Sequence, residues 1–139
     1  MAKTKIIGTT ARLAGILTIL TTVPHVILGT AEVMQGIKLG DVRSSMVPVI
    51  KNIWVLSCIM LPLSGMWILF LVRDLKRLER RAWWQAILIG LSFAGAGIAA
   101  MVWSGIQIHL LLFVLIGLLL FIPMLLWAGS FSSKNTKNH

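Results

Sequence analysis

The chain of 139 residues is 58% hydrophobic and only 12% charged, with a mean hydropathy of +0.92. Because a soluble domain is typically about 25% charged, this composition excludes an ordinary soluble globular protein. The formal net charge of +9 resembles that of a nucleic-acid-binding protein. We reject that interpretation and expect no nucleic-acid partner, because the basic residues cluster at the ends of apolar stretches, as topology signals do.

The first half of the chain predicts two membrane-spanning helices. A short polar lead-in, 1–10, precedes a first span over about 11–33, and an outer loop over 34–47 then leads to a second span over about 48–72. Each apolar stretch has roughly the 20 residues that a transmembrane helix needs. Pro48 is expected to open the second helix, where its missing N–H costs nothing.

The second half predicts a charged loop over 73–81, a third span over about 82–103 and a fourth over about 106–129. Spans three and four follow each other so closely that we expect a tight antiparallel hairpin. The sequence therefore predicts an all-α integral membrane protein, built as a four-transmembrane-helix antiparallel bundle in one domain, 1–131. Residues 132–139 would form a polar cytoplasmic tail.

Basic residues predict how this bundle is oriented. With four spans, ten of the 13 basic residues fall on one side: Lys3, Lys5, Arg12, Arg73, Lys76, Arg77, Arg80, Arg81, Lys134 and Lys137. Cytoplasmic loops carry the excess of lysine and arginine, so the N- and C-termini are both expected in the cytoplasm. The expected location is a cell membrane crossed several times, of the bacterial inner-membrane type.

The first span carries the main functional signal. His25 lies near its middle, and Thr18, Thr21, Thr22, Gly29 and Glu32 fall with it on one stripe about 100° wide around the helix. An ionisable residue inside a bilayer is costly, so it indicates a functional site by default. Seven residues place Glu32 about 10 Å along the helix from His25, at opposite ends of one ligand or water chain.

The other polar and aromatic groups lie toward the outer surface. The predicted catalytic groups are His25, Glu32 and His109. The predicted ligand-binding groups are Thr21, Thr22, Gly29, Asn52, Trp54, Trp103 and Gln107. The inner half of the bundle has almost no intramembrane polar groups. We therefore expect a one-sided pocket that opens toward the outer leaflet rather than a continuous pore.

Three chemistries fit these residues. The first is acid–base catalysis on a hydrophobic, lipid-like molecule by His25 and Glu32, as in an isomerase, cyclase or epoxide hydrolase. The second is ligation of a cofactor: zinc accepts two histidines and one glutamate, whereas haem would need His25 and His109 at matching depth. The third is proton-coupled transport. The sequence requires no cofactor, and we favour an enzyme or binding protein for a hydrophobic ligand.

Simpler interpretations stand beside these. His25 could be a core histidine hydrogen-bonded to a threonine or to the carbonyl freed by Pro24, and Glu32 and His109 could be interfacial side chains. Ala86, Gly90, Ala94 and Gly97 form a stripe of small residues on span three that permits close helix packing. Packing within the chain is favoured over a homo-oligomer or membrane-complex contact. The alternative function, a non-catalytic subunit of a larger complex, would use this stripe to dock; membrane lipids are expected neighbours in every case.

Overall fold

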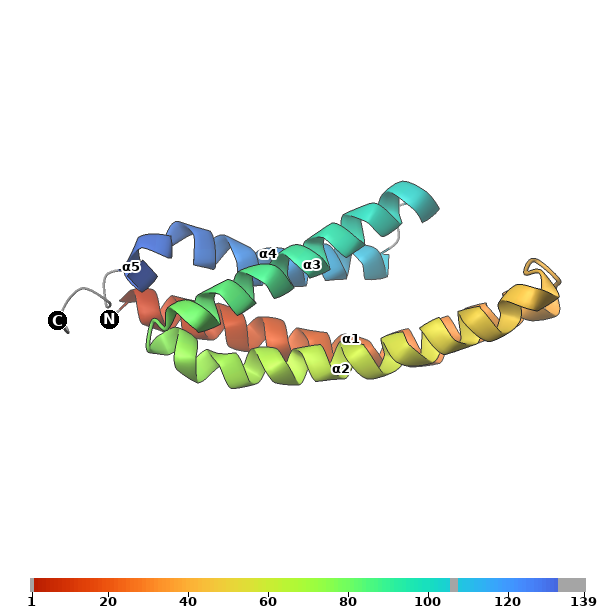
Figure 1. The fold of residues 1–139 in the computed structure, drawn as a ribbon, viewed down its shortest axis with the longest axis horizontal. Helices are drawn as coiled ribbons and strands as arrows, with labels where there is room; N and C mark the ends of the chain where they lie inside the picture. The colour runs from red at the N-terminus through yellow and green to blue at the C-terminus, as the bar shows by residue number, and fades with distance from the viewer. Residues whose placement is uncertain (1, 106–107, 133–139) are drawn as a thin grey trace.

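The computed structural model describes residues 2–105 and 108–132, which are helical throughout apart from short connections. The elements are α1 (Ala2–Lys38), a 3₁₀ turn η1 (Ser44–Met46), α2 (Val47–Lys76), α3 (Arg80–Ser104), α4 (Ile108–Leu126) and α5 (Ala128–Ser132), as Figure 1 shows. Within this part of the chain, α1 to α4 are each long and apolar enough to cross a membrane. The prediction of a four-span all-α membrane protein is confirmed.

Helix α1 is longer than the predicted first span. It begins at Ala2, so the expected polar lead-in is helical, and it runs on to Lys38. The expected outer loop over 34–47 is therefore wrong in extent and shrinks to 39–46. Hydropathy marks the part of a helix that is buried in lipid, whereas the helix itself continues until a residue stops it. Gly40, with a φ of +77°, supplies that stop.

Two predicted local features are present in the structure. Pro48 lies in the first turn of α2, as expected, whereas Pro62 lies inside the same continuous helix. Helix α3 ends at Ser104, and Gly105 follows with a φ of +83°, a backbone conformation that favours glycine. The turn between α3 and α4 is thus placed where the sequence predicts it.

The helices pack as two hairpins. Helix α1 lies along α2 and α3 lies along α4, while the two hairpins meet mainly through α1 and α4 (Figure 1). The stripe of small residues on α3 packs within the chain: added Cβ atoms at Gly90 and Gly97 would lie 2.9 Å from the Gly117 carbonyl oxygen and 3.0 Å from the Leu110 carbonyl oxygen of α4. Gly15 and Gly65 make the equivalent close contact between α1 and α2.

We call the end that holds Ala2, the α2–α3 connection and α5 the basic end, and the opposite end the distal end. The buried residues gather toward the basic end, where Ile7, Ile68, Leu75, Ile116, Leu120 and Met124 are fully buried. Trp83 is half-buried there and donates its indole N–H to the Met124 carbonyl oxygen at 2.8 Å. At the distal end α1 and α2 extend beyond α3 and α4, and α3 diverges from them (Figure 1). The distal half is therefore the looser half.

Candidate functional site

A cavity of about 180 Å³ lies in this looser half, between α1, α2 and α4. Its lining residues are Thr21, Pro24, His25, Leu28, Gly29 and Glu32 from α1, Trp54 from α2, and His109, Leu112 and Phe113 from α4. Six of the ten predicted site residues are among them: Thr21, His25, Gly29, Glu32, Trp54 and His109. The polar stripe of α1 thus faces a cavity on the side where α4 packs.

The depth of His25 follows from the charges on α1. Arg12 and Glu32 bound an uncharged stretch, 13–31, which is roughly 28 Å long, close to the thickness of a bilayer core of about 30 Å. His25 lies roughly 9 Å from the distal limit of this stretch and roughly 18 Å from the other. It is therefore about one third of the way in from the distal end of this stretch.

Aromatic rings surround His25. Its ring centroid lies 4.6 Å from that of Trp54 on α2 and 6.3 Å from that of Phe113 on α4. Phe113 in turn stacks on Phe93 of α3 at 5.7 Å. The four rings form a row that crosses all four spanning helices. Aromatic pairs at these separations contribute about 0.5–1.5 kcal/mol each beyond the burial of their area, so the row holds the imidazole in place.

The alternative of a core histidine satisfied by a threonine finds no support in the hydrogen bonds. The Thr21 hydroxyl donates to the carbonyl oxygens of Leu17 and Thr18, both at 2.9 Å, and the Thr22 hydroxyl donates to that of Thr18 at 3.1 Å. No described residue makes a hydrogen bond with the His25 ring. The ring nitrogens of His25 are therefore able to make hydrogen bonds to a molecule in the cavity.

Two small features of α1 place the Trp54 indole against His25. Thr30 accepts a hydrogen bond from the indole Nε1 at 3.0 Å. Gly29 leaves the space that the ring occupies, because a Cβ at this position would overlap the ring. The pair Gly29 and Thr30 therefore forms a seat for Trp54, which explains the glycine in the polar stripe.

Thr30→Val tests this seat without changing the shape of the side chain. The variant removes the acceptor for the indole N–H, and we expect it to lower the free energy of unfolding by about 0.5–1.5 kcal/mol. Unfolding of the purified protein in mixed micelles with increasing sodium dodecyl sulfate measures the change. Thr9→Val, at an exposed position on the same helix, is the control. An equal effect of both variants would contradict the assigned hydrogen bond.

Glu32 and His109 lie at the rim of the cavity, where both side chains are exposed. His109 precedes Phe113 by one helical turn, so it lies roughly 6 Å farther toward the distal end than the ring beside His25. Within the described residues, no group of three or more histidine, cysteine, aspartate or glutamate side chains is arranged to hold a metal ion. His25 thus lies deeper in the cavity than the two exposed ionisable groups at its rim.

Three other predicted site residues do not line the cavity, and Gln107 is outside the described residues. Thr22 is half-buried on α1, Asn52 is exposed on α2, and Trp103 at the end of α3 is 94% exposed. Helix α3 contributes no described lining residue, because its distal end diverges from α1 and α2 (Figure 1). The prediction of Trp103 as a ligand-binding group assumed that all four helices pack side by side along their whole length.

Helix α4 supplies the wall instead, through the predicted His109 and through Leu112 and Phe113, which sequence reasoning missed. His109, Leu112 and Phe113 are spaced by three and four residues, which places them on one helical face. This spacing was a usable signal, because His109 and Phe113 interrupt a nearly aliphatic span. Leu28 and Pro24 were also missed, although they flank the predicted stripe on α1.

Comparisons with known proteins leave the candidate site to be judged on its own geometry. That geometry consists of a histidine on the wall of a cavity within the membrane span, an aromatic row that holds it, and two ionisable groups at the rim. No protein-family model, curated protein or solved structure matches this chain.

Proposed function

We propose that this protein holds a hydrophobic, lipid-like molecule in the cavity beside His25 and performs acid–base chemistry on it. The reaction would be of the isomerase, cyclase or epoxide-hydrolase type. The single observation that carries the proposal is the placement of the His25 imidazole on the cavity wall, inside the uncharged stretch of α1. Polar groups at such a depth are costly and mark functional sites.

The size of the cavity narrows the kind of ligand. Pockets for drug-sized molecules usually measure about 300–1,000 Å³, whereas this cavity measures about 180 Å³. It therefore fits only one functional group or one short segment of a larger molecule. The remainder of a lipid-like ligand would extend into the bilayer past the exposed apolar side chain of Leu28, which lines the cavity.

Each lining group has a distinct task in this proposal. His25 takes a proton from the bound molecule or gives one to it. Trp54 presents its ring beside His25, where it stabilises positive charge that develops on the ligand. His109 and Glu32, at the rim, exchange protons between His25 and water through a short chain of solvent molecules.

His25→Ala and Glu32→Gln test the proposal directly. Purified protein would be incubated with an extract of membrane lipids, and products would be identified by mass spectrometry. We expect His25→Ala to lower turnover by about 10²–10⁴-fold, the usual contribution of a general acid or base. We expect a smaller loss for Glu32→Gln, because Glu32 lies at the rim. Thr22→Ala, on the same helix but outside the cavity, is the control; survival of activity in both site variants would refute the proposal.

The two other functional hypotheses have less support. The accessory-subunit hypothesis relied on the small-residue stripe of α3, but α4 covers that stripe in this structure. A transporter needs a polar route across the membrane, whereas among the described residues the buried side chains of the inner bundle are apolar apart from Thr18. Co-purification of a stoichiometric protein partner from detergent would favour the subunit hypothesis over the ligand pocket.

A further inference from the structure

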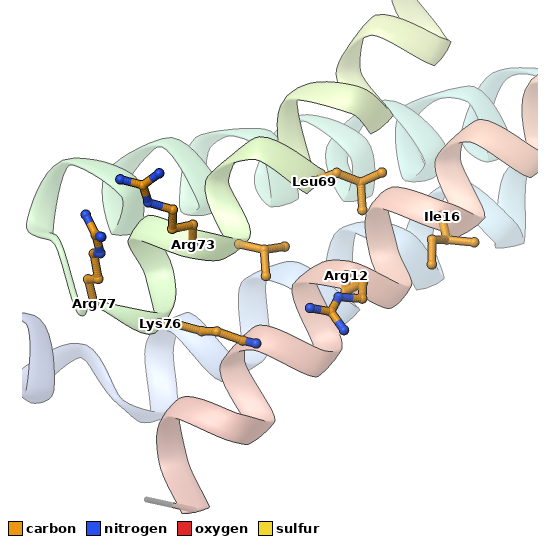
Figure 2. Close-up of a pocket in the computed structure, with 7 residues that line it drawn as sticks. Arg12, Ile16, Leu69, Arg73, Lys76 and Arg77 are labelled. Atoms are coloured by element: carbon orange, nitrogen blue, oxygen red, sulfur yellow. The ribbon is translucent and has the colours of Figure 1, made fainter.

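A second, larger cavity of about 730 Å³ lies at the basic end, between α1 and α2 (Figure 2). Its lining residues are Arg12, Ile16, Leu69, Val72, Arg73, Lys76 and Arg77. Four of these seven side chains are cationic, three are apolar, and none is acidic. The cavity therefore combines a concentrated positive charge with an apolar wall.

Two of the cationic side chains approach each other from different helices. Lys76 extends from α2 toward α1, and Arg12 of α1 points toward it (Figure 2). The stem of Lys76 lies over Gly8, where a Cβ would overlap it. Two cations held close together repel each other. An anion bound between them attracts both, so the net electrostatic interaction becomes favourable. The acidic residues nearest in sequence, Asp74 and Glu79, line a different cavity together with Arg81.

The height of the cavity matches that of lipid headgroups. Arg12 and Arg73 are the first charged residues beyond the uncharged stretches of α1 and α2 at this end. Ile16 lies one turn deeper on α1 and is 42% exposed. A molecule with a phosphate at the level of the arginines would thus meet apolar side chains at the level of its glycerol and acyl groups.

We propose that this cavity binds the phosphate of an anionic phospholipid. Basic pockets between transmembrane helices are suited to such headgroups, because the charge is concentrated where the phosphate lies. A topology signal alone requires only that basic residues be on one side of the membrane. It does not require Arg12 and Lys76 to approach each other from two helices beside an apolar wall. This inference is independent of the function proposed for the cavity beside His25.

Native mass spectrometry of the detergent-solubilised full chain tests the proposal. The protein would be mixed with equal amounts of phosphatidylglycerol and phosphatidylcholine, and the bound lipids would be counted. We expect preferential retention of phosphatidylglycerol by the wild type. The double variant Arg12→Gln/Lys76→Gln should lose about 30-fold in affinity for this lipid, at about fivefold for each cation removed.

The matched control is Lys3→Gln/Lys5→Gln, which removes the same charge from exposed positions on α1 outside the cavity. Equal losses in the two double variants would overturn the proposal in favour of a general attraction to positive charge. No preference for phosphatidylglycerol in the wild type would overturn it as well.

Two further measurements keep the outcome decisive. Because Lys76 packs on Gly8, Arg12→Gln/Arg73→Gln provides a second cavity variant that leaves this contact in place; helical circular dichroism would check that each variant is folded. Inorganic phosphate would be added as a competitor. A lipid site should retain phosphatidylglycerol at phosphate concentrations equal to that of the lipid, whereas full displacement there would indicate a site for free phosphate and overturn the lipid assignment.

Discussion

Replacing Gly117 with alanine is expected to lower the free energy of unfolding by about 1–3 kcal/mol, the usual cost of an extra methyl group in a closely packed interior. An added Cβ would lie 2.6 Å from the carbonyl oxygen of Gly90 and 2.8 Å from the Cβ of Ala94. The Gly90 contact is with backbone, so relief requires α3 and α4 to move apart. Their separation would also shift Phe113, which packs between Phe93 and His25.

Gly95→Ala on α3 is the matched control for this prediction. Among the described residues, no atom outside the local helix lies within 4 Å of a Cβ placed at Gly95, and the position is exposed. Alanine there should leave stability unchanged or raise it by about 0.5–1 kcal/mol, because glycine is the poorer helix former. Unfolding in mixed detergent micelles gives both values. If Gly117→Ala is no less stable than Gly95→Ala, the close contact of α3 with α4 is wrong.

Replacing Gly29 with alanine is expected to displace the Trp54 indole from His25. The added methyl group would occupy the position of the ring, so the indole must leave both the imidazole face and its hydrogen bond with Thr30. We expect a loss of stability of about 0.5–1.5 kcal/mol from the aromatic contact alone. We also expect a cavity that no longer retains the ligand proposed above.

Nuclear magnetic resonance of protein labelled at its three histidines measures this displacement. In the wild type, the indole ring current should shift the His25 ring signals, which the His25→Ala spectrum would assign. Gly29→Ala should move these signals toward the positions of an exposed histidine. Gly36→Ala, seven residues farther along α1 and with open space around its Cβ, should leave them unchanged. Unchanged signals in Gly29→Ala would contradict the assigned contact.

Much of the architecture could be predicted because it depends on local properties of the chain. Hydropathy over about 20 residues reports how long a segment can remain in lipid, and this is why four spans could be located. Helical geometry sets the angular position of each side chain around the helix axis. The polar stripe on α1 could therefore be predicted without knowing which helices pack against it. The ends of α1 could not be predicted this way, because hydropathy does not report where a helix stops.

The sequence by itself therefore determined that the protein is an all-α membrane protein, how many spans it has, and which face of α1 carries His25, Gly29 and Glu32. Only the tertiary structure decided that α4, not α3, closes the cavity with Phe113 and His109. The physical reason is that helix pairing depends on how small residues fit between helices far apart in sequence, as Gly90 and Gly117 do. Those contacts determine how far α3 diverges from α1 and α2 and how closely α4 packs on α1. Neither property can be predicted from the sequence of a single helix.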